Sequence, residues 1–312
     1  MAHAALRPML LTAFLLAAAT SPVTAAPLTI DGETTLKYET IRYHRSDVAD
    51  ISDTERTLRL NFHQALSEQT EIFFRFGHQS YAGSATKENN SGLDQYGLLV
   101  NNKDMLFKIG SQDTYLGAYG AMFDNSSNAG FGMFKGIDWR TTTGRIQYHA
   151  TFGKLDSALF SDSANHTISG GEIAYFAGST RFMASALHIP HLEKATTFTG
   201  FSVNSPHGKA EYLAEYVRSS APDQNQGILV GINYQPTEYQ AIKILGGEIQ
   251  DKAVPEGKAS LGGYDNSLRG FQIAFIQALT PQDRLSLKYT VAQTITFDIP
   301  IHKTEIEYTH TF

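Results

Sequence analysis

Apolar and polar side chains alternate along almost the whole chain from residue 28 onward. The clearest runs are at 58–63, 72–77, 145–152, 228–234 and 284–291. In the first of them, Leu58, Leu60 and Phe62 alternate with Arg59 and Asn61. A period of two places successive side chains on opposite faces of a β-strand, and no segment keeps a helical period for three turns. The pattern therefore predicts an all-β domain whose strands have one apolar and one polar face.

The connections between these runs are of two kinds, short and long, which alternate along the chain. Short connections lie near 67–70, 101–104, 142–144, 177–180, 204–208, 235–238 and 280–283. Longer polar connections lie near 46–53, 83–92, 112–132, 155–169, 190–195, 219–226, 251–267 and 294–302. Seven turns and eight loops join sixteen strands, which puts both chain ends on one side and lets the first strand pair with the last. Fourteen and eighteen strands are the alternatives, because boundaries drawn from sequence shift by ~2–4 residues.

Alternating runs of about ten residues, with short turns on one side and long loops on the other, are typical of transmembrane β-strands. Lipid offers backbone groups no hydrogen-bond partner, so such strands must close into a barrel without edges. We therefore predict a closed antiparallel transmembrane β-barrel of about 16 strands. A secreted soluble β-sandwich or β-solenoid is the alternative fold. It does not account for the regular exchange of turns and loops or for the aromatic residue at the end of the chain.

The N-terminal segment has the features of a secretory signal peptide. Arg7 supplies a positive charge, residues 9–19 are almost wholly apolar, and small residues permit cleavage after Ala25. The alternative is a membrane anchor, but the apolar run is shorter than the roughly 17 residues that a spanning helix needs. We expect residues 1–25 to be a cleaved signal peptide and residues 26–312 to be a single transmembrane β-barrel domain.

Composition fits an exported barrel. Phe, Tyr and Trp make up 11% of the residues, as aromatic girdles at two membrane interfaces require. The mean hydropathy of −0.24 is ordinary, because polar lumen positions dilute the apolar ones. The chain has no cysteine, so strand pairing and not a disulfide framework must supply stability. Because the net charge is −6 and no basic run occurs, we expect no nucleic-acid partner.

Short catalytic and cofactor-binding motifs are missing from the sequence. It has no Gly-x-Ser-x-Gly elbow, no His-Glu-x-x-His pair and no phosphate-binding Gly-Lys-Ser/Thr loop. The histidines are scattered about one to a strand, which suits polar wall positions better than a metal site. We therefore expect no enzyme activity, no metal and no cofactor. A catalytic set that assembles only in space is the open alternative.

The chain ends on an alternating strand. Tyr308, His310 and Phe312 share one face of the segment 304–312. This ending resembles the closing strand of bacterial outer-membrane barrels. The resemblance implies that Tyr308, His310 and Phe312 form the signal that the barrel-assembly machinery reads. It also implies a location in the outer membrane of a diderm bacterium, with outer-membrane lipid as a partner.

The longest connection, 112–132, has an unusual composition for a solvated loop. It mixes glycine with the bulky side chains of Tyr115, Tyr119, Met122 and Phe123. A purely solvated loop would carry more charge and less aromatic surface. We expect this third loop to fold inward and to pack against the inner wall. A barrel of about 16 strands is too wide for side chains to fill, so an inward loop would set the width of an aqueous channel.

Two segments carry a family resemblance. Residues 93–97 (Leu-Asp-Gln-Tyr-Gly) and 107–113 (Phe-Lys-Ile-Gly-Ser-Gln-Asp) are similar to the porin barrels of diderm Firmicutes. Porins are trimeric outer-membrane channels whose third loop constricts the pore. The resemblance therefore implies a homotrimer that passes small hydrophilic solutes and ions. The Firmicutes proteins usually carry an S-layer-homology domain that grips the cell wall. Here the first strand follows the leader almost directly, so the resemblance implies the pore without the wall tether.

Charged residues out of phase with the apolar ones are expected to face the lumen. The basic residues of this kind are Arg42, Arg59, Arg75, Lys108, Arg140 and Arg145. In porins a basic wall faces acids of the third loop, so the resemblance implies that Asp113 and Asp124 oppose these cations. Further acids lie round the wall at Glu172, Glu211 and Glu215. Rings of charge set ion preference in pores. The alternative is that these residues are solvated or paired and have no part in selectivity.

Three functions are compatible with the sequence. The first is a porin for passive diffusion of small hydrophilic solutes and ions. The second is a substrate-selective channel on the same barrel, marked by aromatic side chains such as Tyr115 and Tyr119 along the path. The third is a barrel without transport, such as a surface lipase, a protease or an adhesin.

Overall fold

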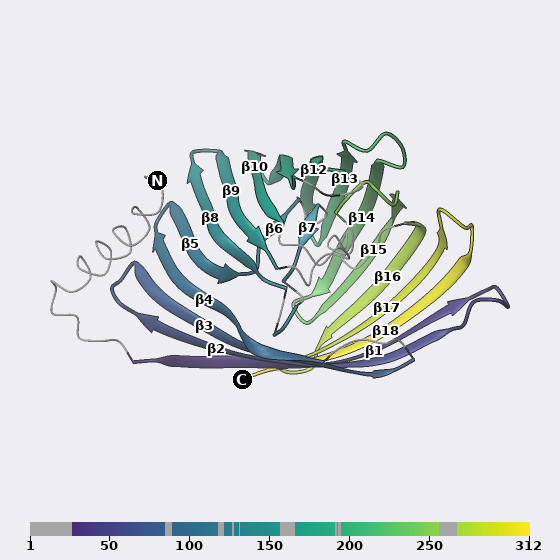
Figure 1. Ribbon diagram of the computed structural model, residues 1–312, viewed down its shortest axis with the longest axis horizontal. Coiled ribbons are helices and arrows are strands. Elements are labelled where there is room, and N and C mark those ends of the chain that lie inside the picture. Colours follow the sequence, from purple (N-terminus) through teal and green to yellow (C-terminus); the bar gives the residue numbers. More distant parts are fainter. Residues whose placement is uncertain are drawn as a thin grey trace.

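The computed structural model describes residues 27–84, 89–117, 122–126, 128–130, 132–156, 166–190, 192, 195–255 and 267–312. Sixteen strands of this part of the chain close into one antiparallel barrel (Figure 1). These strands are β1 (Thr29–Tyr43), β2 (Ile51–Ala65), β3 (Thr70–Gly83), β4 (Asn90–Asn102), β5 (Met105–Gln112), β8 (Phe134–Thr143), β9 (Ile146–Leu155), β10 (Thr167–Ala177), β11 (Thr180–His188), β12 (Thr197–His207), β13 (Ala210–Ser219), β14 (Gln226–Thr237), β15 (Gln240–Ile249), β16 (Leu268–Ala278), β17 (Asp283–Thr294) and β18 (Pro300–Thr311). The closed all-β barrel of about 16 strands is confirmed. Residues 1–25, the expected signal peptide, lie outside the described residues.

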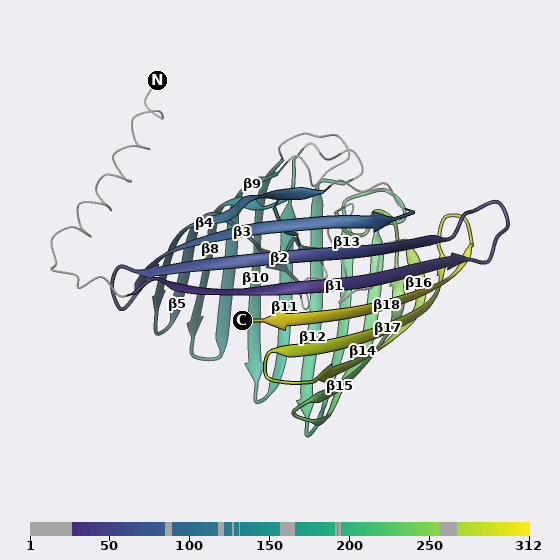
Figure 2. The same ribbon diagram turned by 90° about the horizontal axis from the view of Figure 1, so that it is seen from below.

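Each barrel strand pairs antiparallel with its neighbours along the chain, and β1 pairs with β18 to close the ring. The closing register runs from Glu33 opposite Thr311 to Tyr43 opposite Ile301. Figure 2 shows these first and last strands side by side. After β5 the chain leaves the wall and forms a short hairpin of β6 (Tyr115–Leu116) and β7 (Phe123–Asp124). It then returns to the wall, so that β5 pairs directly with β8.

The two ends of the barrel differ, as the sequence predicted. Short turns join the strands at one end, called the turn end here, at 66–69, 103–104, 144–145, 178–179, 208–209, 238–239 and 279–282. Gly144 and Gly178 have φ angles of 60° and 63°, a left-handed conformation that glycine adopts without strain in a two-residue hairpin turn. The longer connections begin and finish at the opposite end, the loop end. The start of β1 and the finish of β18 both lie at the turn end.

The outward face of the wall is apolar and the inward face is mostly polar. On β16, Phe271, Ile273 and Phe275 are exposed, whereas Gln272 between them is 2% exposed. This arrangement is the reverse of a soluble sheet and suits a wall that faces lipid outside and water inside. Within the described residues, no helix has the length and apolar character needed to cross a membrane.

Candidate functional site

The third loop folds into the barrel, as expected. Leu116, Met122 and Phe123 have no exposed surface. Their packing partners on the inner faces of β8 to β12 are Phe134, Leu155, Ile168, Leu187 and Phe198. Figure 1 shows β6 and β7 inside the ring of strands. Burial of this apolar surface is the main favourable term that holds the loop against the wall.

Near this cluster, the inner wall carries a row of glycines on four neighbouring strands. Gly97 pairs with Gly110, Gly110 with Gly136, and Gly136 with Gly153. A Cβ atom at Gly136 would lie 2.6 Å from the ring of Phe134, and one at Gly153 would lie 2.5 Å from the same ring. Gly136 and Gly153 therefore leave space for the Phe134 ring against the wall, at the point where the loop rejoins it.

A buried ion pair fixes the loop to β3 and β4. Nε and one terminal nitrogen of Arg75 lie 2.9 and 3.1 Å from the two carboxylate oxygens of Asp94. The guanidinium also donates to the backbone oxygen of Asn128 at 3.0 Å, and the amide of Gly130 donates to Asp94 at 2.6 Å. The β3–β4 register shifts at Arg75, and this bulge leaves both Asp94 and Gln95 buried. Arg75 thus faces the interior of the barrel, but its guanidinium is engaged in the contacts that hold the third loop.

A second polar anchor joins the loop to β8, β9 and β10. His149 lies between two carboxylates, with Nε2 2.7 Å from Asp138 and Nδ1 2.9 Å from Glu172. Both ring nitrogens donate at once only when the imidazole carries two protons. The same carboxylates reach the loop, because Thr114 Oγ1 donates to Asp138 at 2.9 Å and the amide of Gly117 donates to Glu172. All these groups are buried, and buried carboxylates need hydrogen-bond donors in place of water. Here the donors are His149, Thr114 and the amide of Gly117.

Arg140 and Tyr115 meet where the loop surface faces the interior. Arg140 donates to the Tyr115 hydroxyl at 3.0 Å, and its guanidinium carbon lies 4.6 Å from the centre of the Tyr115 ring. The other side of the guanidinium lies 3.1 Å from Asp138. Tyr115 remains 44% exposed. The loop therefore presents an aromatic ring, backed by a cation, toward the space in the barrel.

Arg42 was predicted to face the lumen, and this prediction is wrong. It is exposed on the outward face of β1, in phase with Leu36 and Tyr38. The cause lies at the loop end of the strand, where the inward positions are taken by the apolar Ile41 and Tyr43. These two residues pack on a cluster inside the barrel and reverse the local pattern of apolar and polar residues.

Arg145, another predicted wall residue, lies in a turn. Arg145 was assigned to a strand, but it is exposed in the two-residue turn between β8 and β9, at the turn end. The prediction of Arg145 as a wall residue is therefore wrong by one position. Tyr119 lies outside the described residues.

The remaining predicted residues have varied surroundings. The Lys108 ammonium lies 5.7 Å from the centre of the Phe73 ring, which is buried on the inner face. Asp124 accepts a hydrogen bond from the amide of Ser126 at 2.8 Å, and Asp113 is half-buried just beyond β5. Their share in ion selection stays a prediction.

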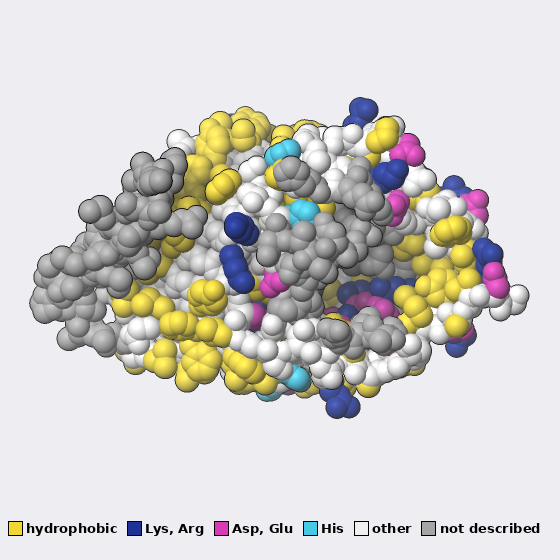
Figure 3. All heavy atoms as spheres, viewed as in Figure 1, with side chains coloured by type: hydrophobic (Ala, Val, Ile, Leu, Met, Phe, Trp, Pro, Cys, Tyr) yellow, Lys and Arg dark blue, Asp and Glu magenta, His cyan; other side chains and the backbone are white. Residues whose placement is uncertain are grey.

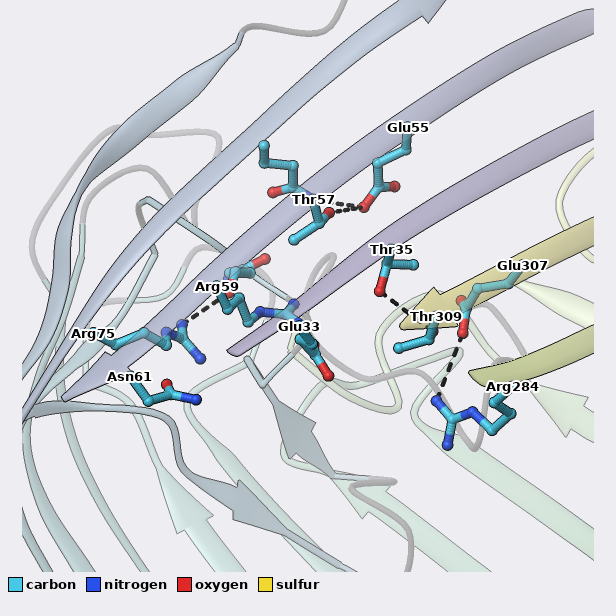
Figure 4. A network of polar contacts seen from close by, with 12 residues as sticks. Glu33, Thr35, Glu55, Thr57, Arg59, Asn61, Arg75, Arg284, Glu307 and Thr309 are labelled. Carbon is cyan, nitrogen blue, oxygen red and sulfur yellow. Dashed lines mark hydrogen bonds and ion pairs between the residues drawn. The ribbon is translucent and has the colours of Figure 1, made fainter. Parts of the chain in front are cut away.

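The inner faces of β17, β18, β1 and β2 carry contacting charges of both signs, a set called the charged wall here. Lys37 lies 2.6 Å from Glu55, and Lys303 lies 3.0 Å from Glu39. The other pairs are Arg59 with Glu33, Lys288 with Glu305, and Arg284 with Glu307. Figure 4 shows part of this set, with Arg59 beside Glu33 and the contact between Arg284 and Glu307.

The charged wall departs from what the porin resemblance implied. A wall of cations was expected, but acids and bases alternate across these strands. Of the predicted cations, Arg59 alone belongs to the charged wall. The other four cations of the charged wall were not predicted, although each is out of phase with outward apolar neighbours in the way that singled out Arg59: Lys37, Arg284, Lys288 and Lys303. In the ring order, β1 lies eight strands from β11, so the charged wall is across the barrel from the third loop.

A second segment lies inside the barrel, which the sequence did not predict. Ala253 and Val254, just after β15, are buried together with apolar side chains on the inner faces of β13 to β18. Lys252 anchors this segment to the β13–β14 connection, with its ammonium 2.5 Å from Asp223. The third loop and this segment therefore cover the apolar parts of the inner wall and leave the charged wall to face the remaining space.

Figure 3 shows the result from one face of the molecule: basic and acidic side chains gather inside a hollow to the right of centre.

Among the residues that the structure describes, no cluster of histidines and carboxylates has the arrangement of a metal site.

Solved porin structures share this fold. No protein-family profile matches the sequence, and no curated protein matches it either. Salmonella typhi OmpF, solved in complex with daunomycin, is 11% identical with a TM-score of 0.65, over 91% of this chain and 97% of that one. A triple mutant of Rhodopseudomonas blastica porin is 8% identical with a TM-score of 0.62, over 92% of this chain and 100% of that one. At such identity the likeness shows the fold: a 16-strand porin barrel.

Proposed function

We propose that this protein is an outer-membrane porin, a water-filled channel for passive diffusion of small hydrophilic solutes and ions. The observation that carries the proposal is the contrast between the two faces of one closed wall. Outside, exposed aromatic and aliphatic side chains suit lipid; inside, the charged wall offers paired carboxylates and ammonium groups to water. A barrel without transport would not need so many charged side chains along an open interior.

The path for solutes runs between the third loop and the charged wall. The loop is held in place by contacts with four wall residues: Arg75, Asp94, Asp138 and Glu172. It is therefore a fixed constriction of the lumen and not a moving loop. The charged wall pairs as many acids as bases, so it carries no net charge. We therefore expect a channel with weak ion preference.

Membrane insertion and assembly belong to the same proposal. The alternating strand that ends on Phe312 supports recognition by the barrel-assembly machinery, and the leader at 1–25 supports export. Trimeric assembly and a kinship with the porins of diderm Firmicutes rest on the resemblance at 93–97 and 107–113.

A substrate-selective channel is the second candidate, favoured by one observation. The exposed Tyr115 ring, backed by Arg140, is an amphipathic surface in the path of a solute. Aromatic faces of this kind stack on flat apolar surfaces of ligands, and the guanidinium can add a hydrogen bond or a charge contact.

Single-channel recording of the purified protein in planar lipid bilayers tests the proposal. We expect steady steps of conductance that grow with salt concentration, and little block by any single solute. Block at low concentration by one solute, reduced by Tyr115→Ala, would support the selective channel instead. Correctly folded protein that gives no conductance would contradict both, and would favour a barrel without transport.

A further inference from the structure

Five of the six outward-facing cations on the described barrel strands lie at the loop end of the wall. In the described strands, the outward Lys and Arg residues are Arg42, Arg56, Lys135, Lys154, Arg218 and Arg269. All of these except Arg56 are second from the loop end of their strand. The outward positions of the same strands near the turn end carry no Lys or Arg. The outer surface of the barrel is therefore polarised along its axis.

Two of these cations lie directly opposite each other. Lys135 of β8 pairs with Lys154 of β9 in the ladder. Facing side chains on neighbouring strands have Cβ atoms about 5 Å apart, and like charges in this position destabilise a sheet. Within the described part of the chain, neither ammonium has an ion-pair partner. Asp138 of β8 faces inward, whereas Asp156 follows β9 and Asp113 follows the neighbouring β5, both further toward the loops.

Apolar side chains occupy the next outward row, on the side toward the turn end. Ile137 and Phe152 also pair with each other, and they are 37% and 61% exposed. Each lies two residues from a lysine on the same face, a separation of about 7 Å along the strand. Lys135, Lys154, Ile137 and Phe152 thus form a compact patch, called the lysine patch here, with two cations above two apolar side chains.

We propose that the lysine patch binds the phosphate of an anionic membrane lipid, whose acyl chain lies along Ile137 and Phe152. A phosphate between the two ammonium groups turns their mutual repulsion into two charge-assisted hydrogen bonds. The apolar row sets a lipid apart from free phosphate, because only the lipid has a chain to cover it. The position of the cations near the loop end places the headgroup at the water interface. The acyl chain then reaches toward the membrane core, along the axis of the barrel.

Native mass spectrometry of the whole protein in detergent tests the proposal, with phosphatidylglycerol as the anionic probe and phosphatidylcholine as the neutral one. We expect one phosphatidylglycerol site that is filled at concentrations where phosphatidylcholine does not bind. K135Q/K154Q should weaken this site about tenfold or more, because both charge-assisted contacts are lost. The variant K103Q/R145Q is the matched control, since it removes two exposed cations at the turn end and should keep wild-type affinity. Circular dichroism verifies that each variant remains a barrel.

Three outcomes would overturn the proposal. Equal affinity of K135Q/K154Q and wild type would show that the patch is not the site. An equal loss in K103Q/R145Q would show that binding follows net charge alone. Displacement of the lipid by an equal concentration of inorganic phosphate, together with unchanged affinity in I137S/F152S, would identify a site for free phosphate. This readout does not involve conductance, so it stands or falls separately from the channel function.

Discussion

The ring of Phe312 lies across Gly32, where the last strand meets the first. A Cβ atom at Gly32 would lie 2.9 Å from the tip of the Phe312 ring. The two residues also exchange both backbone hydrogen bonds, each 3.0 Å long. An aromatic ring that covers a glycine on the facing strand shields the bare backbone and pins the register. The last residue of the chain therefore closes the seam against the one residue type that leaves it room.

Gly32→Val should weaken the seam, because the added Cβ atom would lie 2.6 Å from the backbone oxygen of Arg59 on β2 and would also displace the Phe312 ring. Overpacking of this kind costs about 1–3 kcal/mol. Urea unfolding of the refolded barrel, followed by tryptophan fluorescence, measures the change. Thr34→Val, at the next outward position of β1, is the matched control and should have little effect. Equal stability of G32V and wild type would mean that the ring has no part in closure.

Removal of Phe312 should reduce the amount of assembled barrel far more than the amount of polypeptide made. The residue supplies the seam contact, and in our proposal it also ends the signal that the assembly machinery reads. Heat-modifiable mobility on gels separates assembled from unassembled protein in cell envelopes, and immunoblots of whole cells report synthesis. If the assembled fraction matches that of the wild type, the assembly role of the terminal residue is disproved.

Single charge changes in the charged wall should shift ion preference in opposite directions. Lys37→Gln removes one positive charge from beside Glu55 and should move the channel toward cations, whereas Glu55→Gln removes one negative charge from beside Lys37 and should move it toward anions. Reversal potentials under a potassium chloride gradient measure the shift. Arg42→Gln removes a cation from the outer face of β1 and should leave the potential unchanged. Potentials that do not move in either wall variant would show that ions pass elsewhere.

Deletion of residues 115–128 should raise conductance and weaken whatever ion preference the channel has. The deletion removes the β6–β7 hairpin and the exposed Tyr115, which we propose to be the constriction of the lumen. Single-channel recording measures both quantities, after circular dichroism has verified the barrel. Conductance and preference equal to those of the intact protein would mean that the third loop is not the constriction.

Arg75 and Asp94 should be strongly coupled. Loss of one partner leaves a buried charge uncompensated, which costs about 3–5 kcal/mol, so R75A and D94A should each destabilise the folded protein. The double variant should lose less than the sum of the two. Urea unfolding measures the energies, and channel noise reports release of the loop. Arg59→Ala, in a more exposed pair on β2, is the control and should cost less. Additive losses would exclude the coupling.

The strand pattern was readable from sequence because side chains alternate strictly wherever lipid meets water across the wall. Arg59 follows the rule and lies inside. Arg42 breaks it, because Ile41 and Tyr43 are apolar residues that face inward and pack against a cluster built from side chains of β13 to β18 and the start of the β15–β16 connection. A pattern of local hydrophobicity does not contain that contact.

The candidate site was harder to predict than the wall. The aromatic content of the third loop indicated that it folds inward, and Leu116, Met122 and Phe123 do so. Its anchors could not be found in the same way. Asp94 points inward only because a bulge in β4 adds a residue to the strand, and Glu172 reaches the loop from a strand that follows it in the chain. Such partners are set by register and closure, which single-strand periodicity does not specify.

The third loop is tied at one side to β3 and β4 through Arg75 and Asp94, and at the other to β10 through Glu172. These attachment points are separated around the ring by β5, β8 and β9. A segment fixed at both sides acts as an internal strut that opposes flattening of the cylinder when the surrounding bilayer is compressed. Loss of these attachments should therefore leave a barrel that is mechanically softer and whose cross-section is less round.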